Sequence, residues 1–279
     1  MTQSFTPGRS ESLIVSGKQV RQPQEIFFVR HLMNMNFAEL KTMSLYKFYN
    51  IKALTSLLTD SMLYIDRINT WEDVYENFFL KAHFFSKSLN TYIYTDSIAN
   101  AVFGQSWTYA PETDAMWRIY SQNKTGVRIQ TNAMKLFKSI FVDDGCIADT
   151  WLGKVEYNSE EEMNDFILRE TETNTDSASI WRDLMPYSQF LKRSEFEHEK
   201  EFRIIKMLDS SSSENAKQYK RLAFKIDINN FIDSYLLDPR LDEKTFEQQK
   251  HNLINLGADP LKIFKSSLYS FKPLTITLD

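Results

Sequence analysis

Hydrophobic and polar positions along the chain switch repeatedly between two spacings. Alternating positions and short apolar runs, which are typical of strands, predict strands over residues 44–49, 62–65, 101–109, 126–130, 151–157, 221–228 and 263–265. Spacings of three and four residues, which gather apolar side chains on one helix face, predict helices over residues 25–41, 51–59, 111–120, 132–139, 180–193 and 243–256. Residues 230–237 fit either a helix or a strand. Asn50 is the expected N-cap of one helix, and Gly257 the expected residue just past the end of another.

The order of these elements indicates the fold class. Strands and helices follow one another without the regular alternation of a doubly wound sheet. We therefore predict an α+β fold, a single mixed domain with a central, largely antiparallel sheet flanked by helices. Residues 1–40 are expected to form an N-terminal arm and helix, and residues 41–279 the single α+β domain. Residues 158–179 are acidic and polar, and predict a helix start followed by an exposed loop; residues 209–213 predict a serine-rich loop.

Composition narrows the function classes. The formal net charge is −4 and the sequence pI about 5.7, which argues against the strongly basic surface of many nucleic-acid-binding proteins. The single cysteine, Cys146, excludes an internal disulfide and is expected to be structural. No stretch reaches the roughly 18 apolar residues that a membrane span needs, and the N-terminus lacks the pattern of a secretory signal. We therefore expect a soluble, cytoplasmic protein.

Residues 196–205 hold the densest group of candidate catalytic side chains. In a strand, alternate residues share a face, so Glu197, Glu199, Glu201 and Arg203 would line one face together. Carboxyl groups this close raise one another's pKa unless a cation intervenes, and such a pair suits acid–base or oxocarbenium chemistry. A helix is the alternative, in which Glu197–Lys200 and Glu199–Arg203 are ordinary surface ion pairs.

Motifs for several other activities are absent from the sequence. It contains no glycine-rich phosphate loop, no Gly-x-Ser-x-Gly elbow and no His-Glu-x-x-His zinc helix. The four histidines are widely spread: His31, His83, His198 and His251. His31 is expected to serve packing, and no metal is expected.

Four segments, in order, resemble a mostly bacterial family known as domain of unknown function 2971. They are residues 45–49, residues 102–129 with the run Met116-Trp117-Arg118-Ile119-Tyr120, Lys192 with residues 196–203, and residues 263–268. The chain departs from the family pattern at Tyr49, where the family usually has Arg, and at Phe196, where it has Trp. A third departure is the loop 70–76, which keeps only Asp73 and an aromatic residue at Tyr75.

The motif order of that family is similar to that of ADP-ribosyltransferases, which implies NAD as a substrate and transfer of its ADP-ribose group. The resemblance implies that Glu201 stabilises the oxocarbenium-like transition state, that Glu199 orients the acceptor or acts as a base, and that Arg203 holds the carboxylates or meets a phosphate. It implies the following substrate-binding residues: Lys47 and Lys192 for the pyrophosphate, Tyr46 or Trp117 for stacking on a ring, and Tyr120. The expected partners are a small-molecule nucleotide and a macromolecular acceptor, without a membrane.

Two other functions fit the same residues. Members of the family are often linked by genomic context to phage defence, so the chain could be a toxin or, instead, a non-catalytic interaction or sensor module of a defence system. In that case the Glu/Arg cluster is an ion network. A metal-dependent nuclease is the third alternative, and its only candidate ligands are Asp66, Asp73, Glu199 and Glu201.

Overall fold

The computed structural model describes residues 4–7, 12–16, 18–19, 32–73, 75–140, 142–143, 150–173, 180–208 and 219–278. Predictions that concern residues 25–31, His31, Cys146 and the loops at 174–179 and 209–213 lie outside these ranges. The chain divides into two compact units, each assembled from several segments. The first comprises Met1–Leu45, Met62–Tyr109 and Asn132–Ile226, and the second Tyr46–Ser61, Ala110–Thr131 and Asp227–Asp279. The single domain over residues 41–279 stays a prediction.

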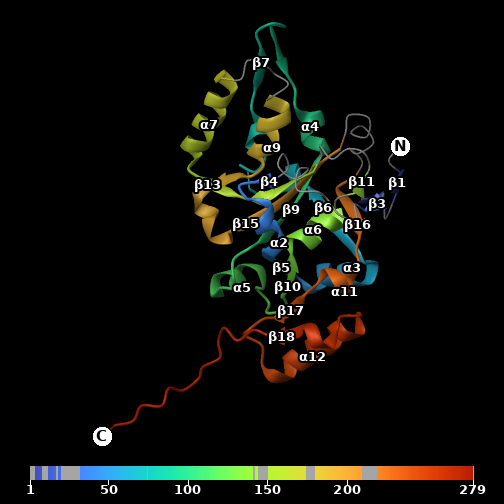
Figure 1. Cartoon of the computed structure of the whole chain (residues 1–279), viewed down its shortest axis with the longest axis vertical. Helices are drawn as coiled ribbons and strands as arrows, with labels where there is room; N and C mark the ends of the chain where they lie inside the picture. Colours follow the sequence, from blue (N-terminus) through green and yellow to red (C-terminus); the bar gives the residue numbers. More distant parts are fainter. Residues whose placement is uncertain are drawn as a thin grey trace. The chain divides into compact units, whose positions relative to one another are not determined.

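The first unit is built on a mixed sheet (Figure 1). Its strands lie in the order β1–β2–β16–β6–β9–β15–β12–β4. Their bounds are β1 Ser4–Pro7, β2 Ser12–Ser16, β4 Leu32–Met33, β6 Met62–Arg67, β9 Val102–Thr108, β12 Thr150–Lys154, β15 Glu201–Met207 and β16 Arg221–Lys225. The β16–β2 and β12–β4 pairs are parallel, and the other pairs in this order are antiparallel. Three small pairs accompany it: β3 (Lys18–Gln19) with β11 (Val142–Asp143), β7 (Phe84–Ser86) with β8 (Thr91–Ile93), and β13 (Glu156–Asn158) with β14 (Leu191–Arg193).

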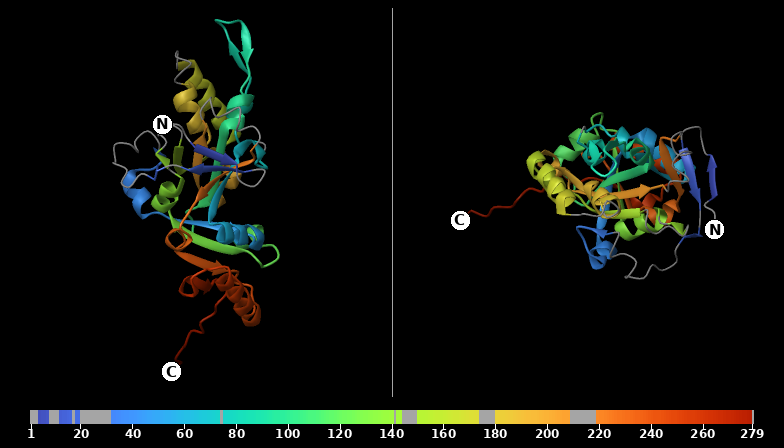
Figure 2. Two further views of the ribbon diagram at one scale, coloured as in Figure 1. Left: turned by 90° about the vertical axis from the view of Figure 1, so that its right-hand side faces the viewer. Right: turned by 90° about the horizontal axis from the view of Figure 1, so that it is seen from above.

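Helices and helical turns flank this sheet. They are α2 Phe37–Thr42, η1 Ile68–Thr70, η2 Phe78–Lys81, α4 Asp96–Ala101, α6 Ala133–Ile140, α7 Glu160–Thr173, η4 Ile180–Leu184, α9 Met185–Ser188 and η5 Ser194–Glu199. Figures 1 and 2 show α7, α9 and the β7–β8 hairpin toward the same side of the unit. The buried core beneath them joins apolar side chains of these elements to the sheet: Ile68, Phe79, Leu80, Val102, Trp151, Ile167, Leu184, Met185, Phe190 and Ile205. A mixed sheet flanked by helices confirms the predicted α+β class.

The second unit has a smaller set of strands, in the order β5–β10–β17–β18. Its elements are β5 Ser44–Tyr49, α3 Ile51–Asp60, α5 Asp114–Tyr120, β10 Val127–Asn132, α11 Ile228–Phe231, β17 Ser234–Leu237, α12 Glu243–Asn255, η6 Pro260–Lys262 and β18 Ile263–Lys265. The first two residues of β5 count with the first unit. Asp238, which is fully buried, accepts hydrogen bonds from Ser121 Oγ at 2.6 Å and Arg240 Nη2 at 2.6 Å. This network ties the end of α5 to the end of β17. None of the helices in the described ranges is long and apolar enough to cross a membrane.

Several predicted boundaries are confirmed because local chemistry sets them. Asn50 Oδ1 accepts a hydrogen bond from the Ala53 N–H at 2.8 Å, as an N-cap should. Gly257 follows α12 with a φ of 93°, a left-handed conformation that glycine adopts without a Cβ penalty. The start of α3 and the end of α12 therefore each depend on residues within one helical turn.

Two predicted helices differ from the structure. The described part of residues 25–41 contains a helix only from Phe37, because Asn36 forms a capping box with Glu39, and residues 32–33 pair with β12 instead. The helix predicted over 180–193 consists of a π-helical turn and a short helix that ends at Ser188. Residues 191–193 leave it to pair with β13 as a strand, which a helical spacing cannot reveal.

A glycine fixes the close approach of β4 to β12. A Cβ added at Gly153 would lie 1.9 Å from the Met33 carbonyl oxygen and 2.7 Å from its carbon. Backbone atoms cannot move aside as the end of a flexible side chain can. We therefore expect Gly153→Ala to lower the free energy of unfolding by about 1–3 kcal/mol. Urea unfolding followed by circular dichroism measures this, and an unchanged unfolding midpoint would contradict the β4–β12 pairing.

Candidate functional site

The central strand β15 positions two of the predicted catalytic residues. It lies between β9 and β12, with Glu201 opposite Thr108, and Arg203 opposite both Ser106 and Gly153. Because alternate residues of a strand share a face, Glu201 and Arg203 point to the same side. The strand is buried along nearly its whole length, so both charged groups need partners inside the protein.

Arg203 is bound on every side of its guanidinium group. Its Nε donates to Glu201 Oε2 at 2.7 Å, its Nη2 to Glu76 Oε1 at 2.8 Å and its Nη1 to the Gln189 carbonyl oxygen at 2.8 Å. The side chain is 1% exposed, and the ring of Trp71 lies 5.1 Å from its guanidinium carbon. Arg203 therefore joins two carboxylates and a backbone carbonyl in a dry environment.

Lys192 supplies the second cation. Its Nζ lies 2.5 Å from Glu201 Oε1, 2.7 Å from Glu199 Oε2 and 3.4 Å from Glu76 Oε1. The ring of Phe196 lies 4.5 Å from the same nitrogen. We call Glu76, Lys192, Glu199, Glu201 and Arg203 the carboxylate–cation network. Two further groups complete it: Ser106 Oγ donates to Glu201 Oε2 at 2.8 Å, and Tyr157 Oη accepts the Glu201 N–H at 2.8 Å.

The environments of the two glutamates shift their pKa values in opposite directions. Burial raises the pKa of Glu199, the hydrogen bond to Glu201 raises it further, and Lys192 opposes both. Burial would also raise the pKa of Glu201, but the charges of Arg203 and Lys192 outweigh it and hold that pKa far below the usual range. Three carboxyl groups face two cations, and the raised pKa falls on Glu199, the carboxyl group that has Lys192 but not Arg203 as a partner. Glu199 is also the more exposed, with 15% of its side chain accessible against 7% for Glu201.

For residues 196–205 the sequence left a strand and a helix open, and the structure divides the segment between them. Residues 194–199 form the 3₁₀ helix η5, and Lys200 turns the backbone with a φ of 44° before β15 begins at Glu201. This turn breaks the alternation, so Glu197 is exposed and pairs with Lys200 at 2.7 Å. That ion pair is one of the two that the helical alternative predicted. In place of the other, Glu199–Arg203, Glu199 pairs with Lys192, and Arg203 with Glu76 and Glu201. Glu199 nevertheless meets Glu201, because the turn folds it back toward Lys192.

Three residues of the site were not predicted. Glu76 contacts Arg203 across 127 residues of sequence, and Ser106 and Tyr157 come from β9 and β13. The signal for Glu76 was its place at the end of the acidic, aromatic segment 71–76, whose Asp73 binds Arg193 at 2.9 Å. No pattern in the sequence singled out Ser106 or Tyr157.

The remaining predicted substrate-binding residues lie in the second unit. Trp117 is fully buried, stands edge-on to Phe48 at 4.9 Å and donates from Nε1 to Glu112 at 2.8 Å. Tyr120 is 42% exposed and stacks on Phe48 at 5.6 Å. Lys47 Nζ lies 5.9 Å from the ring of Tyr49, and Tyr46 lies beneath Arg128. The stacking candidate Trp117 therefore offers no surface to a ligand, whereas Tyr120, predicted only as substrate-binding, does.

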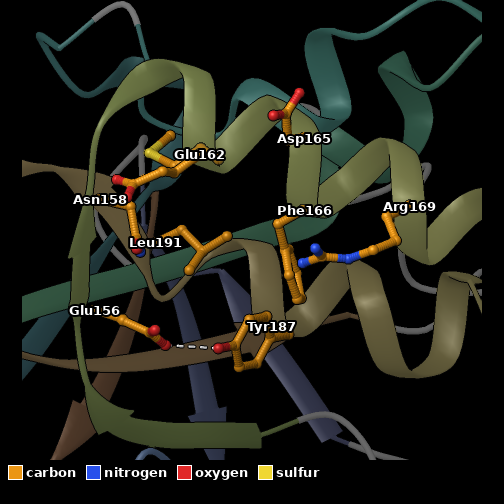
Figure 3. Close-up of a pocket in the computed structure, with 9 residues that line it drawn as sticks. Glu156, Asn158, Glu162, Asp165, Phe166, Arg169, Tyr187 and Leu191 are labelled. Atoms are coloured by element: carbon orange, nitrogen blue, oxygen red, sulfur yellow. Dashed lines mark hydrogen bonds between the residues drawn. The ribbon is translucent and has the colours of Figure 1, made fainter.

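A pocket of about 350 Å³ lies behind the network in the first unit (Figure 3). The strands β13 and β14 separate the two: Glu156, Asn158 and Leu191 line the pocket, whereas Tyr157 and Lys192 contact Glu201. Tyr187 Oη donates to Glu156 at 2.6 Å, and Figure 3 shows the Arg169 guanidinium directed toward Phe166. One short ribbon therefore carries the pocket wall on one face and network residues on the other.

The acids of the nuclease alternative are held by cations. Asp66 lies 3.2 Å from Arg221 Nε, and Asp73 is bound by Arg193. Within the described ranges, no group of three or more His, Cys, Asp or Glu side chains is placed to hold a metal ion. The structure thus gives the nuclease hypothesis no metal centre to build on in that part of the chain.

Comparison with solved structures finds three of DarT from Thermus sp. 2.9. They are its complexes with NAD+ (10% identity, TM-score 0.36), with carba-NAD+ (11%, 0.35) and with ADP-ribosylated ssDNA (10%, 0.37). The matches cover 82%, 81% and 82% of this chain and 98%, 96% and 96% of those chains. No curated protein sequence matches the chain.

A family model matches the middle of the sequence. It covers residues 116–204, a span that begins at the Met116–Tyr120 motif and ends just past Arg203. These are the second and third of the four segments from which the resemblance was predicted. Residues 116–204 match the family described as protein of unknown function (DUF2971), so the predicted resemblance is confirmed over that segment.

Proposed function

We propose that the chain is an ADP-ribosyltransferase-like enzyme that uses NAD at Glu199 and Glu201. The observation that carries this proposal is the pairing of a partly exposed carboxyl group of raised pKa with a buried, fully paired one. Two carboxyl groups whose environments push their pKa values apart are the arrangement used in acid–base and glycosidic chemistry. The order of the family motifs, similar to that of ADP-ribosyltransferases, supports the same reaction class.

Burial changes the roles assigned from sequence. Glu201 was expected to meet the ribose, but both of its oxygens are occupied by Lys192, Arg203 and Ser106. We assign the ribose contact to Glu199 and treat Glu201, Lys192 and Arg203 as positioning residues. With its proton released, Glu199 gives the network one excess negative charge, which complements the positive charge that develops on the ribose.

The reaction then proceeds as follows. The bond between ribose C1′ and the nicotinamide nitrogen breaks, and its electron pair neutralises the pyridinium as nicotinamide leaves. An oxygen of water or of an acceptor forms the new bond to C1′, and its proton passes to ionised Glu199. Water gives ADP-ribose, and a macromolecular acceptor gives an ADP-ribosylated product. A place in phage defence or as a toxin rests only on the genomic context of the family.

A non-catalytic interaction or sensor module is the second candidate. The observation that favours it is the complete pairing of Glu201, Lys192 and Arg203 within the protein. Such a network perturbs pKa values without any reaction. If this second candidate function is correct, glutamine at position 199 should serve as well as glutamate.

Nicotinamide release from NAD by the purified protein tests the two candidates. We expect turnover by the wild type and its loss in Glu199→Gln, with cell extract and single-stranded DNA supplied in separate arms as acceptors. Glu197→Gln is the matched control, because Glu197 lies two residues earlier and is exposed. If folded wild type releases no nicotinamide in any arm, the enzyme proposal is rejected in favour of the binding module.

A further inference from the structure

Arg128 stands in the middle of the second unit's strands. On β10, Val127, Ile129 and Thr131 are buried, and Arg128 and Gln130 point to the opposite face. The neighbouring strand β5 places Tyr46 against Arg128, with the ring centre 4.4 Å from the guanidinium carbon. Figure 1 shows β5 and β10 side by side in this unit. Arg128 is therefore a partly buried cation held flat against an aromatic ring.

Two nitrogens of its guanidinium group lack hydrogen-bond partners. Nε and Nη1 are buried and make no hydrogen bond, and no ion pair of Arg128 occurs among the described residues. Arg240 of the same unit, in contrast, binds Asp238 at 2.6 Å. Burial lowers the pKa of Arg128, with Glu112 and Tyr46 opposing. Buried donors without an acceptor are costly, and the charge of Glu112 acts on Arg128 without a hydrogen bond to either buried nitrogen, so the arrangement suits an acceptor that the protein itself does not supply.

The geometry of the group indicates how an anion would bind. The third nitrogen, Nη2, is not among the buried atoms that lack a partner, and Arg128 as a whole is only partly buried. An anion with two oxygens at Nη2 can take Nε or Nη1 as its second donor, in the fork geometry of arginine. Either mode would satisfy one of the two buried donors.

The same face carries an aromatic surface. Phe48 lies two residues after Tyr46 on β5, so their side chains share a face, and Phe48 stacks with half-exposed Tyr120. A guanidinium beside an exposed aromatic stack offers one contact for a phosphate and another for a base. We propose that Arg128, Tyr46 and Tyr120 form a site for the phosphate and base of a small nucleotide. The site lies within the second unit and does not depend on the reaction proposed at Glu199.

Binding of inorganic pyrophosphate and ADP, measured by calorimetry, tests this site. We expect at least a tenfold loss of affinity for both in Arg128→Met, and a smaller loss in Arg128→Lys, which keeps the charge but not the fork. ADP should bind more tightly than pyrophosphate, and Tyr120→Ala should remove that difference. Arg118→Met is the matched control, since Arg118 is an exposed arginine on α5 paired with Asp114 at 2.7 Å. Equal binding by Arg128→Met and wild type would overturn the proposal.

A thermal melt without ligand separates this role from a structural one. If Arg128 binds an anion, its replacement removes two buried donors that have no acceptor in the free protein, so Arg128→Met should melt at or above the wild-type temperature. Pyrophosphate should raise the Tm of the wild type and not that of the variant. A lower Tm for Arg128→Met, no binding by wild type, or binding only to an acidic peptide or to DNA would each overturn the nucleotide assignment. These readouts stay interpretable even if the protein releases no nicotinamide.

Discussion

Replacing Arg203 by Met is expected to lower the free energy of unfolding by about 3–5 kcal/mol, the cost of breaking a buried ion pair from one side. Met keeps much of the volume but none of the donors. Glu76 and Glu201 would lose their shared cation, and the Gln189 carbonyl would lose its donor. Lys192 alone would face three carboxyl groups. Urea unfolding followed by circular dichroism gives the magnitude.

The matched control is Arg182→Met, an arginine that pairs with Asp183 while both side chains are 65% exposed. Exposed ion pairs contribute little because water already solvates both charges, so we expect a change within about 0.5 kcal/mol. Breaking an intact buried pair costs about 3–5 kcal/mol of the free energy of unfolding. A loss below about 1 kcal/mol for Arg203→Met would show that Arg203 does not pair with both carboxylates as described.

Glu199→Gln is expected to reduce the rate of nicotinamide release by about 10²–10⁴-fold, the usual contribution of a positioned acid–base group. Glutamine keeps the shape of the side chain but cannot accept a proton or carry the negative charge. Because Glu199 balances rather than anchors the network, its loss should leave the fold intact, as judged by an unchanged melting curve. Glu197→Gln should retain the wild-type rate. A Glu199→Gln variant as active as wild type would contradict the assignment.

The pH profile should separate the roles of the two glutamates. In the proposed reaction ionised Glu199 accepts the proton, so kcat/KM should rise with pH as Glu199 loses its proton. The raised pKa of Glu199 places this rise above the usual range of a glutamate. Burial is the largest cause of the raised pKa of Glu199, and the hydrogen bond and the negative charge of Glu201 raise it further. Glu201→Gln removes that negative charge and that carboxylate hydrogen bond. The rising limb should therefore move to lower pH in Glu201→Gln. An unmoved limb in that variant would mean that Glu201 does not control Glu199.

Elements with local signals were predictable from the sequence. The Asn50 cap, the glycine after α12 and the strands β5, β10 and β18 each depend on residues close together in the chain. The same holds for the position of Glu201 and Arg203 on one strand face, since a spacing of two fixes it once the strand exists. The resemblance of the motifs to a known family was also readable, and the family match covers residues 116–204.

Contacts between distant segments were not predictable. The chain turns at Lys200 instead of continuing as a strand, and no local pattern indicates this turn. One of its contacts comes from far away in the sequence: Tyr109 donates its N–H to the Lys200 carbonyl oxygen at 3.0 Å. Likewise, residues 191–193 leave a helical spacing to pair with β13. Pairing with another strand outweighs local propensity once it buries backbone hydrogen bonds.

The sequence by itself determined which charged residues this protein has and which of them share a strand. Only the tertiary structure decided which glutamate is fully paired with cations and which has the raised pKa. Glu76, Ser106 and Tyr157 reach Glu201 and Arg203 from three separate segments, and their arrival sets both burial and pairing. A pKa depends on every charge and on all the water within a few ångströms, and the sequence does not specify those neighbours until the chain has folded.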